Sequence, residues 1–98
     1  MNNEPNSERL EKAARCLRTM AHPLRLMIIH LLSQREHSVQ ELEKELGASQ
    51  SSISQHLSLL KDKDILTSRR AAQQVFYRLH NPRMLDLITL TRELFCKE

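Results

Sequence analysis

Glycine and proline are scarce in this 98-residue chain, which contains one glycine and three prolines. An all-β fold needs many tight turns, and such turns depend on these two residues, so their shortage argues against a β-sandwich. Leucine instead dominates the apolar residues, with 17 leucines against five isoleucines and two valines. Because unbranched side chains lose little rotamer freedom in a helix, this composition favours a mainly α-helical domain.

Long apolar runs and cysteine clusters are missing as well. No apolar run approaches the roughly 18 residues that a membrane-spanning helix needs, and the first thirty residues are too charged for a secretory signal. The two cysteines are too few for a disulfide framework and are not spaced like metal ligands. We therefore expect a soluble cytoplasmic protein with reduced thiols, no membrane partner, no metal and no cofactor.

The balance of residue types describes a small folded domain with a basic surplus. With 40% hydrophobic and 28% charged residues, the chain is not of disordered composition. Its length corresponds to a single domain with a thin core. The net charge is +3 and the pI is about 9.2, and the basic surplus lies in the carboxyl-terminal half. This charge permits binding of nucleic acid without proving it.

Apolar periodicity predicts two helices in the first third of the chain. Residues 1–6 are polar and are predicted to form a disordered arm. Ser7 can cap a helix over residues 7–21, in which apolar residues recur at spacings of three and four. His22-Pro23 interrupts this pattern, because the residue before a proline is pushed out of the helical conformation. Pro23 itself suits the first turn of a second helix.

Residues 38–62 have the pattern of two short helices joined by a tight turn. Ser38 and Glu41 are spaced as a capping box, in which each side chain accepts a hydrogen bond from the other residue's backbone N–H. Gly47 stands where a left-handed residue ends a helix, and Ser49 can cap the next one. The second helix carries apolar residues at i, i+4 and i+7, namely Ile53, Leu57 and Leu60. The segment is predicted to be a helix-turn-helix.

A two-stranded antiparallel wing and a last helix are predicted to follow. Residues 65–79 contain two β-type segments around a polar link, Arg70 to Gln73, and Ala71-Ala72 is weak turn chemistry that leaves the loop geometry open. Asn81-Pro82 can start a helix over residues 81–96. Apolar residues spread around this helix well beyond the roughly 100° that one packed face needs. We expect a partner chain to cover the second side; the alternative is a few exposed leucines.

Short uncharged polar side chains cover the side of the second helix-turn-helix helix that lies opposite its apolar residues. Glutamine can pair with adenine in the major groove, and serine can contact bases or phosphates. Five serines in this segment lower helix propensity without a packing reason, which is typical of a functional surface, although a merely solvated surface is the alternative. The candidate DNA-binding residues on this helix are Ser49, Gln50, Ser51, Ser52, Ser54, Gln55, Ser58 and Asp62.

Three arginines on the predicted wing are candidates for contact with the phosphate backbone. Arg69, Arg70 and Arg78 carry the charge that phosphate or minor-groove contact requires. For each arginine taken singly, a solvated strand edge protected by charge is an equally good interpretation.

Three segments in order carry a family resemblance: Met20-Ala-His-Pro-Leu-Arg-Leu26, Ser49-Gln-Ser-Ser-Ile-Ser-Gln-His-Leu57 and Arg69-Arg-Ala-Ala-Gln-Gln-Val-Phe-Tyr77. Together with the order of elements, they resemble the ArsR/SmtB family of winged helix-turn-helix transcriptional repressors over roughly Leu10 to Cys96. The resemblance implies a homodimer formed by the first and last helices, with a wing on the flanking groove. It also implies that the serine- and glutamine-rich helix reads DNA through Gln50, Ser51, Ser54, Gln55 and His56.

His56 has a second interpretation. On a helical wheel it lies beside the buried side of the helix, so it can instead orient the helix or reach a phosphate.

The resemblance is nearest to the HlyU/BigR-like members, which lack a metal site. Residues 39–46 contain no cysteine for the thiolate site of lead, cadmium and arsenite sensors, and the last helix contains no histidine for a zinc site. Cys96 matches the carboxyl-terminal cysteine of that subgroup, whereas His30 stands where the second cysteine would be. We hypothesise a regulatory disulfide between Cys16 and Cys96; the alternatives are packing for Cys16 and an idle thiol for Cys96.

These features predict a sequence-specific DNA-binding transcriptional regulator. We expect a homodimeric repressor of a short operon that binds a double-stranded operator and is released by thiol oxidation or a sulfur species. The rival interpretation is a protein-interaction module whose helix-turn-helix does not bind DNA. An enzyme is disfavoured, because one glycine leaves no phosphate-cradling loop and no catalytic triad or carboxylate pair is suggested.

Overall fold

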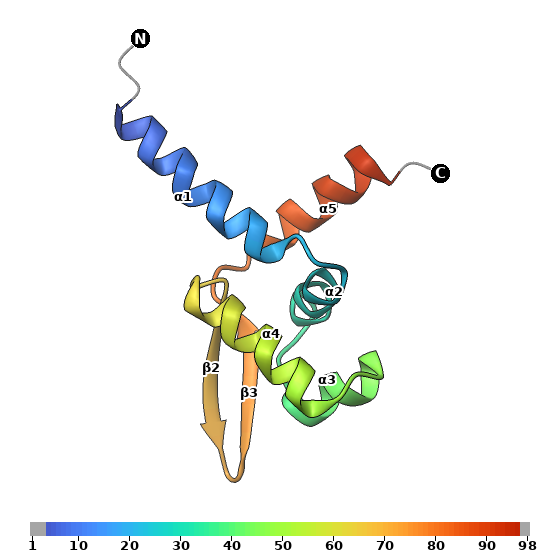
Figure 1. Cartoon of the computed structure of the whole chain (residues 1–98). Coiled ribbons are helices and arrows are strands. Elements are labelled where there is room, and N and C mark those ends of the chain that lie inside the picture. The colour runs from blue at the N-terminus through green and yellow to red at the C-terminus, as the bar shows by residue number, and fades with distance from the viewer. Residues whose placement is uncertain (1–3, 97–98) are drawn as a thin grey trace.

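Five helices and a small antiparallel sheet make up the fold (Figure 1). The structure is a computed structural model that describes residues 4–96. The helices are α1 (Glu4–Met20), α2 (Pro23–Leu32), α3 (Val39–Leu46), α4 (Gln50–Asp62) and α5 (Met84–Phe95). The strands are β1 (His37–Ser38), β2 (Leu66–Ala71) and β3 (Gln74–Leu79). The predicted winged helix-turn-helix with five helices is confirmed.

The sheet has three strands, whereas the sequence predicted only the two of the wing. Strand β1 pairs with β3 in antiparallel register, His37 opposite Tyr77 and Ser38 opposite Phe76, and the strand order is β1-β3-β2. A strand of two residues has no alternating pattern to detect, which explains why it was missed. The wing loop is also shorter than predicted: only Ala72 and Gln73 lie between β2 and β3. Ala72 has a φ of 57°, and the tight turns favoured in two-residue hairpin loops require a positive φ at this first position.

Both outer helices begin at residues other than those predicted. Helix α1 begins at Glu4 rather than after Ser7, so the predicted disordered arm is wrong from Glu4 onward, and its first three residues lie outside the described part. Pro5 is accommodated because a first helical turn needs no N–H from it. Helix α5 begins at Met84, because Asn81 forms a turn instead of a helix cap. The Oδ1 atom of Asn81 accepts a hydrogen bond from the backbone N–H of Arg83 at 2.9 Å.

The local signals around α3 are confirmed in detail. The hydroxyl of Ser38 accepts a hydrogen bond from the Glu41 backbone N–H at 3.1 Å, and Glu41 Oε1 accepts one from the Ser38 N–H at 2.9 Å. Gly47 ends α3 with a φ of 65°, a left-handed conformation that costs glycine nothing. Ser38 and Glu41 thus set the start of α3, and Gly47 sets its end, after which the chain turns into α4.

The core lies where α2, α3 and α4 pack against the base of the hairpin. Its fully buried apolar side chains are all leucine or isoleucine, namely Ile28, Ile29, Leu42, Ile53, Leu57, Leu60 and Leu66. The hairpin of β2 and β3 extends from this core on the side opposite α1 and α5 (Figure 1). The core therefore holds α4 and the wing as one unit.

Helices α1 and α5 diverge from the body of the protein (Figure 1). Both carry exposed leucines, and Leu17 and Leu90 each keep 51% of their surface accessible. Among the described residues, none of the helices combines the length and the apolar character that crossing a lipid bilayer requires. In the single chain, therefore, an apolar surface on α1 and α5 has no covering partner.

Candidate nucleic-acid interface

Helix α4 is held by three apolar side chains and presents polar ones outward. Ile53, Leu57 and Leu60 are fully buried, as their spacing predicted. Ser49 caps the helix through a 3.2 Å hydrogen bond in which its hydroxyl accepts from the Ser52 N–H. We call the outward residues of this segment the α4 surface: Gln50, Ser51, Gln55, Ser58, Leu59 and Asp62 are exposed, and Ser54 is half-buried.

A shallow hollow on the α4 surface is lined by Ser54, Gln55, Ser58 and Leu59. The first three were predicted site residues, and the structure brings them together. Leu59 was missed, although its position away from the buried apolar stripe was a detectable signal. The hollow thus combines hydrogen-bonding groups with one apolar group, and base edges in the major groove likewise present donors, acceptors and the thymine methyl.

His56 does not lie with the other predicted residues of α4. Its Nδ1 atom accepts a hydrogen bond from Arg25 Nε of α2 at 3.0 Å, and its ring centroid lies 4.6 Å from that of His22. Burial of the ring, together with the nearby His22 and Arg25, holds the pKa of His56 below its usual value of 6.5. Of the interpretations left open by the sequence, this geometry fits a residue that orients the helix.

Arg69 of β2 is bound within the protein. Its Nε and Nη2 atoms donate two hydrogen bonds of 2.7 Å to the carboxylate of Glu36, and its guanidinium lies 4.9 Å from the centroid of the Phe76 ring. The paired charges lower the pKa of Glu36 and raise that of Arg69, mainly through these hydrogen bonds. Arg69 therefore binds the wing to Glu36, the residue before β1. The sequence did not predict this ion pair because the two residues are 33 positions apart.

Arg70 and Arg78 remain available on the wing. Both are exposed, and within residues 4–96 neither forms an ion pair. Arg70 stands opposite Val75 in the hairpin, near its loop. Of the three arginines predicted for phosphate contact, these two keep their guanidinium groups free for it.

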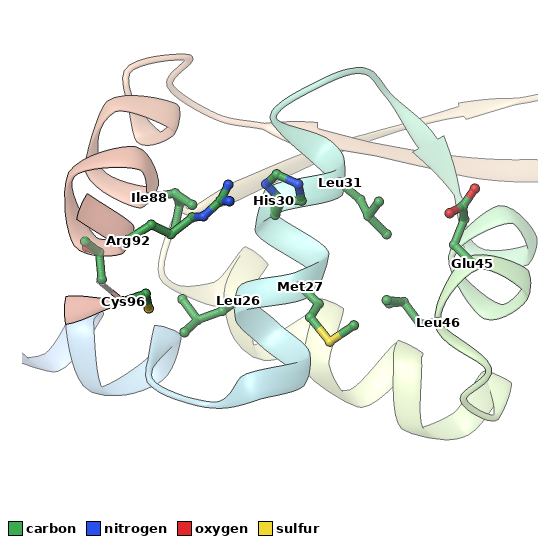
Figure 2. Close-up of a pocket in the computed structure, with 10 residues that line it drawn as sticks. Leu26, Met27, His30, Leu31, Glu45, Leu46, Ile88, Arg92 and Cys96 are labelled. Carbon is green, nitrogen blue, oxygen red and sulfur yellow. The ribbon is translucent and has the colours of Figure 1, made fainter. Parts of the chain in front are cut away.

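The two cysteines lie in different places and are free thiols. Cys96 follows α5 and lines an apolar hollow between α2, α3 and α5, together with His30 and Leu26 (Figure 2). Cys16 of α1 is half-buried and lines another hollow, next to the end of α4. Within one chain the structure does not bring the two thiols together. Among the described residues, moreover, no three histidine, cysteine or acidic side chains gather as metal ligands would.

Comparison with known proteins places this geometry in a family. Residues 22–68, from the start of α2 into β2, match the model described as "Bacterial regulatory protein, arsR family". The chain is 37% identical over 97 residues to the transcriptional activator HlyU of Vibrio cholerae, covering 99% of this chain and 90% of that protein.

Solved structures agree with the sequence comparison. The crystal structure of the transcriptional repressor BigR from Xylella fastidiosa has a TM-score of 0.84 and 36% identity, with all of both chains covered. The homodimeric winged helix-turn-helix DNA-binding domain of Mycobacterium bovis Mb0332 has a TM-score of 0.83 and 25% identity, covering 96% of this chain and 89% of that one. The chain therefore belongs to the ArsR family of bacterial regulatory proteins and is a DNA-binding transcriptional regulator.

Proposed function

We propose that the protein is a homodimeric repressor that inserts the α4 surface into the major groove of a pseudo-palindromic operator. The observation that carries this proposal is the polar, outward α4 surface anchored by three fully buried side chains. Its serine and glutamine side chains are short enough for the helix backbone to approach the bases closely. The free N–H groups at the start of α4 add favourable contact with phosphate. Occupation of the operator represses by blocking the promoter.

The dimer is proposed to form through α1 and α5. Exposed apolar side chains concentrate on these helices: Leu10, Leu17, Leu85, Leu90, Leu94 and Phe95. So large an apolar surface on a small protein is typical of an interface between chains. The Mycobacterium bovis relative is described as homodimeric, which supports a dimer for this chain too. Two α4 helices related by a two-fold axis would enter successive major grooves about 34 Å apart.

Gln55 is expected to carry part of the base preference. Selection from a pool of random duplexes should yield a two-fold-related motif for the parent protein. Replacing Gln55 with alanine should then weaken preference at one position of each half-site by about tenfold, because a bidentate glutamine–adenine contact is worth about 1–3 kcal/mol. Gln34→Ala, which removes an exposed glutamine outside the α4 surface, is the matched control and should keep the parent's motif.

If Gln55→Ala and the parent prefer the same bases to the same degree, Gln55 does not read the operator. Failure of the parent to enrich any duplex would instead favour the protein-interaction module.

The wing arginines are expected to differ in their effects. Arg70→Ala should weaken binding to all duplexes alike and flatten the salt dependence by about one unit of slope for each lost phosphate contact.

Arg69→Ala should act indirectly by loosening the wing. Glu36→Gln removes the carboxylate that pairs with Arg69 but keeps the positive charge of Arg69, so this variant should weaken binding as Arg69→Ala does. Glu45→Gln, which removes an exposed carboxylate of α3, controls for the change in net charge. Binding that Glu36→Gln tightens by more than Glu45→Gln does would show that Arg69 contacts DNA itself. Binding measured over a series of salt concentrations separates these outcomes.

Release from DNA by thiol oxidation stays a prediction. Since Cys16 and Cys96 line separate hollows, a disulfide between them would have to join two subunits or follow a movement of α5.

A further inference from the structure

One guanidinium group joins three helices of the protein. Arg25, in the first turn of α2, donates from Nη1 to the backbone carbonyl of Thr19 in α1 at 2.8 Å. Its Nε atom donates to Nδ1 of His56 in α4 at 3.0 Å. The contact with His56 spans 31 residues of sequence and links α4 to the junction between α1 and α2. We call this pair of hydrogen bonds the Arg25 clamp.

The clamp requires His56 to be neutral. A guanidinium group can only donate hydrogen bonds, so Nδ1 of His56 must accept, and the ring proton must reside on Nε2. Protonation would place an N–H on Nδ1, facing the N–H of Arg25, and would set two positive charges at this distance. The geometry in the structure is therefore incompatible with an imidazolium ring.

The surroundings of His56 offer no compensation for a positive charge. The titratable and charged groups that face it are Arg25 from α2 and His22 from the residue before α2, whereas α1 contributes a backbone carbonyl to the clamp. Nδ1 of His22 accepts a hydrogen bond from the Leu24 N–H at 3.1 Å, which fixes that ring against His56. Within residues 4–96, no carboxylate forms an ion pair with any of the three side chains.

We propose that the Arg25 clamp positions α4 and makes operator binding sensitive to protons, because protonation of His56 breaks its hydrogen bond with Arg25 and so removes the polar contact that orients α4 against α2. His56 is thus a positioning residue, and acid lowers operator affinity through it. This inference rests on the proposed reading of DNA by α4.

The direction of the effect follows from the pKa of His56. Burial, His22 and Arg25 lower this pKa in the folded protein below the usual value of 6.5. The unfolded chain therefore takes up the proton first as the pH falls. The neutral ring therefore contributes to folding stability at any pH above the pKa of His56 in the unfolded chain. This contribution is lost as the pH falls from that pKa to the lower pKa of the folded protein.

The test uses a duplex that the parent has selected at about pH 7.5 and compares how tightly the parent and His56→Asn bind it as the pH is lowered. Asparagine keeps an acceptor near the position of Nδ1 but does not titrate. The parent should lose affinity as the pH is lowered to about 5.5, and the variant should lose about fivefold less. His80→Asn, which removes an exposed histidine outside the Arg25 clamp, is the matched control and should behave like the parent.

The same pH dependence in the parent and His56→Asn would overturn the clamp as a proton sensor while leaving operator binding intact. If His56→Asn fails to fold or to bind DNA, a second measurement on the parent alone tests the clamp. The ¹⁵N spectrum of the parent's histidine rings should show His56 as the Nε2–H tautomer. The Nδ1–H tautomer, or a pKa of His56 at or above 6.5, would contradict the clamp whether or not any duplex is selected.

Discussion

A variant with Leu90 and Leu94 both replaced by glutamate is expected to be a folded monomer that binds the operator at least about 100-fold more weakly. Both side chains lie one turn apart on α5 and are 51% and 57% exposed in the single chain. Four glutamates facing one another across a two-fold axis would repel and would remain unpaired. Because each chain would then bind its half-site alone, the gain from a tethered second half-site is lost. Light scattering after size exclusion measures the mass, and fluorescence anisotropy measures the affinity.

The double variant Gln34→Glu/Gln40→Glu is the matched control. Both glutamines are exposed and lie outside α1 and α5, so this variant adds the same charge and should remain a dimer. A Leu90→Glu/Leu94→Glu variant that still elutes as a dimer would contradict the role of α5 in the interface.

Leu57→Ala is expected to lower the free energy of unfolding by about 3 kcal/mol. Leu57 is fully buried at the centre of α4, between Ile53 and Leu60, and truncation leaves a cavity that the surrounding side chains fill only in part. Since a domain of this size has about 5–10 kcal/mol of stability, the loss is a large share of the total. Unfolding in urea, at one fixed protein concentration because a dimer's stability depends on it, measures the change.

Leu59→Ala provides the comparison on the same helix. Leu59 is 43% exposed, so its truncation should cost less than about 1 kcal/mol. Equal losses for the two variants would mean that α4 is not anchored through Leu57.

Features of the fold that depend on a few neighbouring residues could be predicted from the sequence. The capping box of Ser38 and Glu41, the left-handed Gly47 and the apolar spacing of α4 are all local, and each is confirmed. Such signals work because a cap or a periodic stripe stabilises its own helix wherever the helix packs. The predicted start of α5 was wrong because asparagine can either cap a helix or form a turn. Here Asn81 forms a turn, and the local sequence did not distinguish the two.

The features that were missed join residues far apart in the chain. Strand β1 exists only because β3 pairs with it, and the bond from Arg69 to Glu36 spans 33 residues. The clamp from Arg25 to His56 is likewise set by packing of α2 against α4. The apolar spacing of α4 predicted which side chains face outward. It could not distinguish a residue that orients the helix from one that is available to read DNA.

The structure of the protein bound to a selected duplex tests the proposed function most directly. The account predicts two α4 helices in successive major grooves, with Ser54 and Gln55 within hydrogen-bonding distance of base edges and His56 still held by Arg25. A complex in which the α4 surface faces solvent or another protein chain, with DNA bound elsewhere, would contradict it.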